Sequence, residues 1–178
     1  PHIIIYSLPT PFYVDRPINH KKLETTVIAG LKKLASTGVD FIAIPCNTVH
    51  AYFNNLKRSI DIPLLNIVEE TLKKVKGKQQ KIAVLATKAT IDSNVYQDGI
   101  ALAGHDYVGT PEWQNLINEI ILTIKSGKKI NDAKNKLQNL LKDLKKNKIS
   151  TTIVACTDLN VILEKNANIQ LIDSSKCL

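Results

Sequence analysis

The sequence of 178 residues has no methionine, little glycine or proline, and no long apolar run. No run reaches the roughly 18 apolar residues that a membrane-spanning helix needs, and the N-terminus lacks the pattern of a signal peptide. We therefore expect a cytoplasmic protein without a membrane partner. Glycine and proline number 7 each beside 44% hydrophobic residues, which predicts a packed globule rather than a disordered chain. Because no initiator methionine stands before Pro1, we expect the natural protein to be longer.

Arginine and aromatic residues are also scarce, which argues against a nucleic-acid partner. The net charge is +8, but only two of the 24 basic residues are arginines and aromatic residues make up 5%. Surfaces that bind nucleic acid combine arginine with aromatic side chains. The lysines instead follow amphipathic segments such as residues 134–148, a pattern typical of a solvated helix face. The positive field can equally steer a small anionic substrate.

The three cysteines, Cys46, Cys156 and Cys177, are too few and too widely spaced for a disulfide framework in a chain of this length. Close ligand pairs of the CxxC or HxxxH kind do not occur, so we expect no zinc site. Free thiols are the remaining interpretation.

Short apolar runs rich in β-branched residues alternate with segments of helical periodicity. Near-continuous apolar runs indicate strands that are covered on both faces, as in a parallel sheet between helices. The expected strands are residues 2–8, 39–45, 62–68, 81–87, 151–156 and 169–173. The predicted fold class is therefore α/β.

The polar stretch at residues 76–81 separates two groups of strands and helices. We predict two pseudo-symmetric lobes, each a parallel sheet flanked by helices, with the active site in the cleft between them. The first lobe is expected to contain residues 1–76 plus 168–178, without its N-terminal strand, and the second lobe residues 77–167.

Two cysteines occupy the same sequence setting. In residues 41–48, FIAIPCNT, and residues 151–158, TTIVACTD, an apolar strand leads directly into a cysteine, two polar residues and a helical pattern. Ligands bind at the carboxyl ends of parallel strands, and helix N-termini lower the pKa of a thiol there. One such cysteine is more often structural, but the repetition predicts that Cys46 and Cys156 flank one cleft. Such a pair can remove a proton from one face of a stereocentre and return one to the other.

Four motifs carry a resemblance to a known family: VDRP at 14–17, PCNTVH at 45–50, LATKATIDSNVY at 85–96 and ACTDL at 155–159. With these motifs, in this order, the chain resembles the aspartate/glutamate racemase superfamily, and most closely the aspartate racemases. The resemblance spans essentially the whole chain. It implies racemisation of an acidic amino acid, aspartate first and glutamate second, by a homodimer that needs no cofactor.

The resemblance also implies roles for single residues. Cys46 and Cys156 are then the catalytic acid and base, one as thiolate and one as thiol. Asn47, Thr48 and Thr157, with neighbouring backbone amides, bind the substrate α-carboxylate and oppose the charge that develops as the α-proton leaves.

The remaining implied positions form the outer part of the pocket. Thr87 and Thr90 line it, while Arg16 and Lys125 bind the distal carboxylate. A lone arginine in a loop between prolines suits that role, because its fork matches a carboxylate. A surface salt bridge for Arg16, and complementation of a helix C-terminus by Lys125, are the alternatives.

The motifs also depart from the family pattern. Asp158 stands where these racemases usually have glutamate and where glutamate racemases have histidine, and Ala89 and Asn94 replace common glycines. Relatives also begin roughly 30 residues upstream, with a strand and a glycine-rich turn.

Other interpretations stay open. His50 is more often a packed, hydrogen-bonded residue than a catalyst, and Cys177 lacks the repeated setting. The protein could also be a related isomerase, hydantoin racemase or decarboxylase, or a non-catalytic protein that binds dicarboxylates or senses through its thiols.

Overall fold

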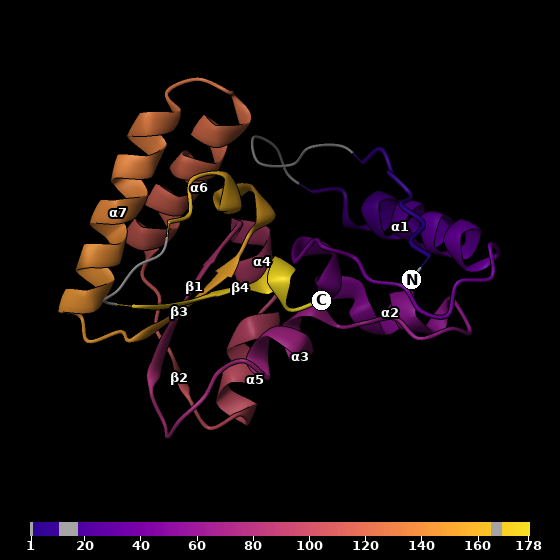
Figure 1. Cartoon of the computed structure of the whole chain (residues 1–178), viewed down its shortest axis with the longest axis horizontal. Helices are drawn as coiled ribbons and strands as arrows, with labels where there is room; N and C mark the ends of the chain where they lie inside the picture. Colours follow the sequence, from indigo (N-terminus) through magenta and orange to yellow (C-terminus); the bar gives the residue numbers. More distant parts are fainter. Residues whose placement is uncertain (1, 11–17, 165–168) are drawn as a thin grey trace.

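The computed structural model describes residues 2–10, 18–164 and 169–178. Figure 1 shows a parallel sheet with its helices in one part of the molecule, and α1 and α2 beside it. With η for a 3₁₀ helix, the elements are α1 (His20–Ala35), η1 (Thr48–Tyr52), α2 (Phe53–Arg58), α3 (Ile67–Leu72), β1 (Lys81–Ala86), α4 (Lys88–Asp92), α5 (Val95–Leu102), β2 (Asp106–Tyr107), α6 (Pro111–Lys125), α7 (Ile130–Lys146), β3 (Thr151–Ala155), η2 (Thr157–Val161), β4 (Gln170–Asp173) and η3 (Ser174–Lys176).

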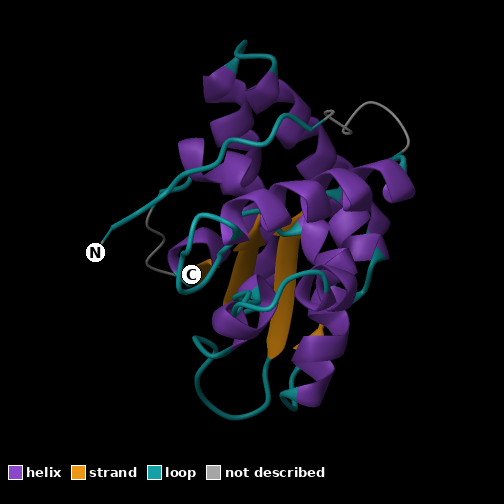
Figure 2. Cartoon of the chain, turned by 90° about the vertical axis from the view of Figure 1, so that its right-hand side faces the viewer, coloured by secondary structure: helices purple, strands orange, loops and turns teal. Residues whose placement is uncertain are grey.

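The sheet has four parallel strands in the order β2-β1-β3-β4. Its central strands, β1 and β3, are buried along nearly their whole length, and Figure 2 shows the strands enclosed between helices. Strands covered on both faces need near-continuous apolar sequence. The α/β fold predicted from the runs at 81–87 and 151–156 is therefore confirmed.

Each face of the sheet has its own core. Leu85 and Val154 pack against the apolar stripes of α6 and α7 on one face. Ile82 and Ile153 pack with residues of α3 and α5 on the other face, as the arrangement in Figure 1 also shows. Successive side chains of a strand point to opposite faces, so one apolar run supplies both cores.

Helix α6 begins and ends at identifiable signals. The Thr110 hydroxyl accepts the N–H of Trp113, and Pro111 occupies the first turn, where its missing N–H is not needed. Trp113 Nε1 donates to Asp143 of α7 at 2.8 Å, which joins the two helices. Lys125 is the last residue of α6. None of the described helices is both long and apolar enough to cross a membrane.

Residues 18–64 contain a second, smaller core, built from α1, η1 and α2. The predicted strands at 39–45 and 62–68 are reduced here to one parallel bridge between Ile42 and Leu64. Ile42 N–H donates to the Pro63 carbonyl, and Leu65 N–H to the Ile42 carbonyl, each at 2.9 Å. Proline lacks the N–H that a longer ladder needs, and Pro63 lies inside one of these runs.

The run at residues 2–8 also differs from its prediction as a strand. Residues 2–10 form no strand, and Ile3 and Ile5 are 78% and 88% exposed. A buried parallel strand needs hydrogen-bond partners at its edges and cover on both faces, which the described residues do not supply to this run. Among the described residues, all strands of the sheet come from residues 81–173, and the earlier residues contribute only the Ile42–Leu64 bridge.

The C-terminal segment pairs with a different part of the chain from the one we expected. We expected residues 168–178 in the first lobe, but β4 pairs with β3 and forms an edge of the sheet. Ile169 and Ile172 are buried against the cores of that sheet, which accounts for the pairing. The C-terminal segment contacts residues 18–64 just beyond β4, where Asn47 Nδ2 donates a hydrogen bond to Ser174 Oγ at 3.0 Å.

Candidate active site

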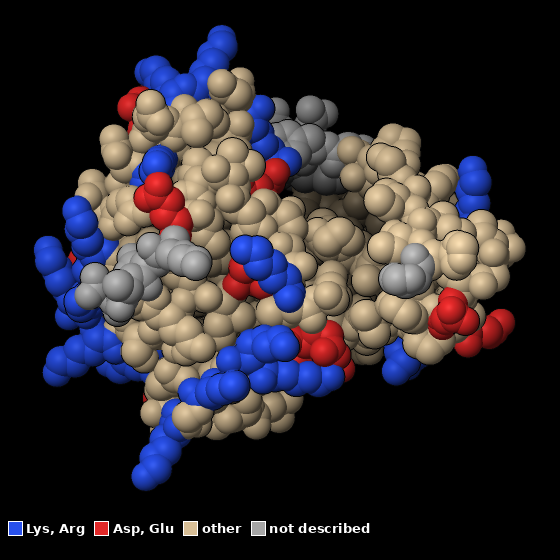
Figure 3. Space-filling model, in the orientation of Figure 1, with Lys and Arg blue, Asp and Glu red and all other residues tan. Residues whose placement is uncertain are grey.

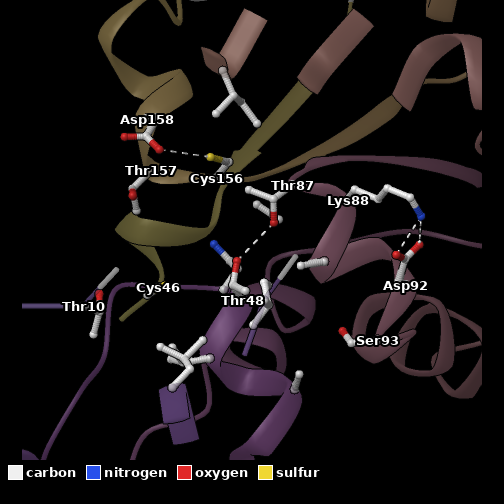
Figure 4. A pocket seen from close by; sticks show the side chains of 18 of the residues that line it. Thr10, Cys46, Thr48, Thr87, Lys88, Asp92, Ser93, Cys156, Thr157 and Asp158 are labelled. Carbon is white, nitrogen blue, oxygen red and sulfur yellow. Dashed lines mark hydrogen bonds and ion pairs between the residues drawn. The ribbon is translucent and has the colours of Figure 1, made fainter. Parts of the chain in front are cut away.

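A cavity of about 760 Å³ lies between residues 46–52 and the ends of β1, β3 and α6 (Figure 4). Its wall is formed both by residues of the smaller core segment, such as Cys46 and Thr48, and by residues at the edge of the sheet, such as Thr87 and Cys156. It brings together most of the predicted site residues: Cys46, Asn47, Thr48, Thr87, Lys125, Cys156 and Thr157. Thr90 is buried behind the wall, and Arg16 falls outside the described residues.

Cys156 stands at the junction between β3 and η2. The strand ends at Ala155, and Cys156 is the N-cap residue of the 3₁₀ helix. Its residue is 7% exposed, and its Sγ donates a hydrogen bond to Asp158 Oδ2 at 3.7 Å. Helix N-termini leave N–H groups without an intrahelical partner, so this junction places a thiol beside backbone donors.

Cys46 lies just before η1, after a segment that forms one bridge at Ile42 in place of a full strand. His50 holds the backbone there, because its Nδ1 lies 2.9 Å from the Cys46 carbonyl oxygen. The other ring nitrogen, Nε2, accepts the N–H of Ile67 at 3.2 Å, so the neutral ring carries its proton on Nδ1 and donates it to Cys46. Burial lowers the pKa of His50, which keeps the ring neutral. His50 therefore positions Cys46.

Burial raises the pKa of both thiols. For Cys156 the pKa is raised to about 12, first by desolvation and then by the negative charge of Asp158. Cys46 is open to solvent on the cavity side, but the protein packed around its other sides desolvates the thiolate. That effect outweighs the backbone N–H groups of Val49 and Thr48 and raises the pKa of Cys46.

The sequence predicted lowered pKa values for these thiols, and that direction is wrong. The motif reveals the helix N–H groups, which do stabilise the thiolates. It does not reveal how many atoms from distant segments surround each sulfur. Desolvation of a buried thiolate is the larger effect here.

Three threonine hydroxyls form a triangle at the cavity wall. Thr48 Oγ1 lies 3.1 Å from both Thr87 Oγ1 and Thr90 Oγ1, which are 3.0 Å apart. Thr48 and Thr87 line the cavity, whereas Thr90 is fully buried. Thr90 therefore orients the other two hydroxyls from behind.

Asn47 lines the cavity but uses its side chain within the protein. Its Oδ1 accepts the hydroxyl of Tyr96 at 2.6 Å, and its Nδ2 donates to Ser174. All three residues are buried. Asn47 thus ties η1 to α5 and to the segment after β4, and this fixes the backbone next to Cys46.

Lys125 reaches the cavity from the end of α6. Its Nζ lies 3.1 Å from Asp158 Oδ2, and the two side chains are 31% and 33% exposed. Asp158 therefore contacts both Lys125 and the thiol of Cys156, as Figure 4 shows for the second contact.

Sequence reasoning missed several residues of this site. Ser174 bonds to Asn47 across 127 positions, and no motif marks it. His20 and Tyr52 also line the cavity and are joined by a hydrogen bond between Nδ1 and the hydroxyl. Tyr52 lies two positions beyond the PCNTVH motif, which is the one signal that could have pointed to it.

Comparisons with known proteins were consistent with this geometry. A family model described as Asp/Glu/hydantoin racemase matches residues 1–178. The chain is 41% identical over 179 residues to the broad specificity amino-acid racemase RacX of Bacillus subtilis, covering 100% of this chain and 78% of that protein. It is 31% identical over 152 residues to a glutamate racemase of Aquifex aeolicus, covering 80% of this chain and 57% of that protein. The structure of an aspartate racemase from Picrophilus torridus aligns with a TM-score of 0.72 at 25% identity, covering 85% of this chain and 64% of that one.

Proposed function

Since this chain belongs to the Asp/Glu/hydantoin racemase family, we propose that it racemises amino acids without a cofactor, with Cys46 and Cys156 as acid and base. The observation that carries the proposal is that the two thiols come from separate segments, Cys46 just before η1 and Cys156 between β3 and η2, and line one cavity. A cysteine that only fills a core has no reason to share a cavity wall with a second one.

The reaction moves one proton at each face of the substrate. The thiolate of one cysteine takes the α-proton and becomes a thiol, which leaves the electron pair on the α-carbon. The thiol of the other cysteine then gives its proton to the opposite face and becomes a thiolate. No oxidant or reductant is required, and the reverse reaction exchanges the roles of Cys46 and Cys156.

The α-carboxylate must hold the negative charge that develops in this step. We assign it to the hydroxyls of Thr48 and Thr87, to Thr157 and to backbone N–H groups at the starts of η1 and η2. Donors that are already oriented stabilise such charge without reorganisation. Thr90 and Asn47 support this arrangement from within the protein, through the threonine triangle and the bonds to Tyr96 and Ser174.

The raised thiol pKa values bear on how the reaction begins. In the free protein both thiols hold their protons near neutral pH, because burial raises the pKa of each. A bound amino acid brings its α-ammonium cation into the cavity, and an adjacent cation favours a thiolate. We infer that substrate binding generates the thiolate, so that the reactive base exists mainly in the complex.

For the side chain, we propose an acidic amino acid, aspartate before glutamate. Lys125 lines the cavity and can bind a distal carboxylate. Arg16, predicted for the same carboxylate, lies outside the described residues. We further propose a cytoplasmic homodimer with two lobes, as the family resemblance implies.

The test is incubation with L-aspartate in deuterated water without pyridoxal phosphate. Deuterium at the α-carbon together with loss of optical rotation is the expected result, and the absence of both would overturn the proposal. Cys46→Ala and Cys156→Ala should each abolish racemisation. A variant with one remaining thiol is expected to exchange the α-proton of one enantiomer only, which separates a two-base mechanism from a one-base mechanism. L-alanine hydantoin serves as a second substrate, because exchange of this compound alone would indicate a hydantoin racemase.

A further inference from the structure

Two lysine-rich segments meet at the end of the sheet where its strands begin. Residues 73–81, which lead into β1, contain five lysines and no acidic residue, and residues 145–148, between α7 and β3, contain three lysines and no acidic residue. Gln80 joins the two segments, because its Oε1 accepts the hydroxyls of Ser150 at 3.1 Å and Thr151 at 2.8 Å. Figure 3 shows basic side chains gathered along the lower side of the molecule, where Figure 1 places these segments. We call residues 73–81 and 145–148 the basic end.

Much of this positive charge is not neutralised by neighbouring carboxylates. Among the described residues, four lysines of the basic end are exposed and form no ion pair: Lys76, Lys78, Lys81 and Lys148. Lys73 pairs with Glu70 at 2.6 Å, and Asp106 is an acidic group next to Lys81 in the sheet. Charges of one sign gathered in this way create a positive potential that attracts an anionic partner.

An exposed apolar tip lies beside the basic end. Residues 101–104, Ala-Leu-Ala-Gly at the end of α5, are all exposed, and Leu102 is 90% exposed. Shortly after this tip, the N–H of Asp106 donates to the Gln80 carbonyl at 3.0 Å, which holds the tip next to the segment before β1. Lysines around an exposed leucine suit the interface of an anionic bilayer, because ammonium groups contact the headgroup phosphates while the apolar side chain leaves water.

We propose that the basic end, together with residues 101–104, docks on the surface of a bilayer that contains anionic lipid. The sequence led us to expect no membrane partner, but that expectation concerned spanning segments, and a surface contact requires none. A bilayer is favoured over nucleic acid for two reasons. Arginine and aromatic residues are absent from both segments of the basic end, and a phosphate backbone offers Leu102 no apolar partner.

Docking at the basic end leaves the candidate active site open. Strands β1 and β3 begin at the basic end, and the cavity is lined by Thr87 and Cys156, which directly follow the same two strands. The six residues of β1, at about 3.3 Å each, separate the two ends of the sheet by roughly 20 Å. A bilayer at the basic end therefore faces away from the cavity, and a small substrate still reaches the cavity from solution. The inference does not depend on the racemase function.

The experiment is cosedimentation of the 178-residue chain with lipid vesicles. One set of vesicles is pure phosphatidylcholine, and the other contains about one third phosphatidylglycerol, which supplies the negative charge. We expect binding to the anionic vesicles only. Raising the salt from about 0.1 M to about 0.5 M should weaken this binding strongly, because salt screens exposed charges.

Two variants test the two parts of the docking surface. The triple variant Lys76→Gln, Lys78→Gln and Lys148→Gln should bind the anionic vesicles about a hundredfold more weakly, because each lysine near an anionic bilayer strengthens binding about fivefold. Leu102→Ser should weaken binding about tenfold, because the side chain no longer leaves water on docking. A second triple variant with arginine at the same three positions keeps the charge and should bind like the wild type, which excludes a general effect of substitution there.

Matched controls come from surfaces away from the basic end. The triple variant Lys22→Gln, Lys32→Gln and Lys57→Gln removes the same charge from exposed positions of α1 and α2. Val161→Ser removes an apolar side chain of η2 that is 69% exposed. Both controls should bind the anionic vesicles within about threefold of the wild type, because charges farther than a Debye length from the bilayer are largely screened.

Three outcomes would overturn the inference. The first is no binding of the wild type to anionic vesicles. The second is an equal loss in the two glutamine triple variants, which would mean that net charge, and not the basic end, attracts the protein. The third is unchanged vesicle binding by Leu102→Ser together with tighter binding of the wild type to a DNA duplex, which would indicate a nucleic-acid surface. None of the substituted residues lines the cavity, so these results and the test of racemase function are separate.

Discussion

His50 and Cys46 are joined by a hydrogen bond of 2.9 Å from the imidazole Nδ1 to the backbone carbonyl of the cysteine. The same ring accepts the N–H of Ile67, at the start of α3, through Nε2. One neutral imidazole thus links the candidate catalytic loop to a helix that packs on the sheet. Protonation of Nε2 would remove its lone pair and break the second contact.

The first prediction concerns the stability of this link at low pH. Burial lowers the pKa of His50 below its ordinary value of 6.5, so the unfolded chain binds the proton first as the pH falls. The contribution of His50 is therefore complete above about pH 6.5 and is lost as the pH falls through the lower pKa of the folded state. Urea unfolding from about pH 7.5 to about pH 5 should show a falling free energy of unfolding. His50→Gln, which keeps a donor and an acceptor but does not titrate, should show a smaller fall, and an equal fall would contradict the assignment.

The second prediction concerns the reactivity of the thiols. A pKa of about 12 instead of 9.0 lowers the thiolate fraction of Cys156 near neutral pH about a thousandfold. Alkylation by iodoacetamide, followed by mass spectrometry of the peptides, should therefore be slow at Cys156. Cys46 is exposed to solvent and should react faster than Cys156, but still more slowly than free cysteine because its pKa is also raised. Rapid alkylation of Cys156 in the folded protein at neutral pH would contradict a raised pKa for this thiol.

That Cys46 and Cys156 line the same cavity could be predicted from sequence, because the pattern of an apolar run followed by a cysteine and polar residues is local. Apolar runs end at both Cys46 and Cys156, and the carboxyl ends of such runs are where ligands bind in parallel α/β folds. In the structure the run before Cys156 is β3, and the run before Cys46 forms only the Ile42–Leu64 bridge. The helices that follow could be predicted for the same reason, although both are 3₁₀ helices. Asn94 has a φ of 58°, and asparagine is one of the few residues other than glycine that tolerate this left-handed region.

The features that could not be predicted depend on contacts between distant segments. An apolar run does not say which strand it will pair with, so β4 joined β3 instead of the first lobe. The partners of Asn47 lie 49 and 127 positions away. The raised pKa values of the thiols likewise depend on atoms that only the packed structure brings around each sulfur.

The third prediction tests the threonine triangle. Thr90→Val removes the buried hydroxyl that lies 3.1 Å from Thr48 and 3.0 Å from Thr87, while the shape of the side chain is kept. Thr48 and Thr87 then lose the partner that orients them, and we expect kcat/KM for α-proton exchange to fall about tenfold, equivalent to roughly 1.4 kcal/mol. Thr90→Ser keeps the hydroxyl and should retain most of the activity. An active Thr90→Val variant together with an impaired Thr90→Ser variant would show that the methyl group, and not the hydroxyl, matters.

The fourth prediction concerns the buried hydrogen bond that holds Asn47 in place. Tyr96→Phe removes the hydroxyl that donates to Asn47 Oδ1 at 2.6 Å, and it leaves that oxygen buried without this donor. Loss of a buried partner costs about 1–3 kcal/mol of unfolding free energy, which lowers the Tm of a chain of this size by about 2–4 °C per kcal/mol. Tyr107→Phe is the matched control, because Tyr107 is only half-buried and its hydroxyl makes no hydrogen bond in the described part of the chain. Calorimetry of both variants should show a clear loss for Tyr96→Phe and little change for Tyr107→Phe. Equal losses would mean that removing a tyrosine hydroxyl destabilises this fold in general, and that Asn47 does not depend on Tyr96.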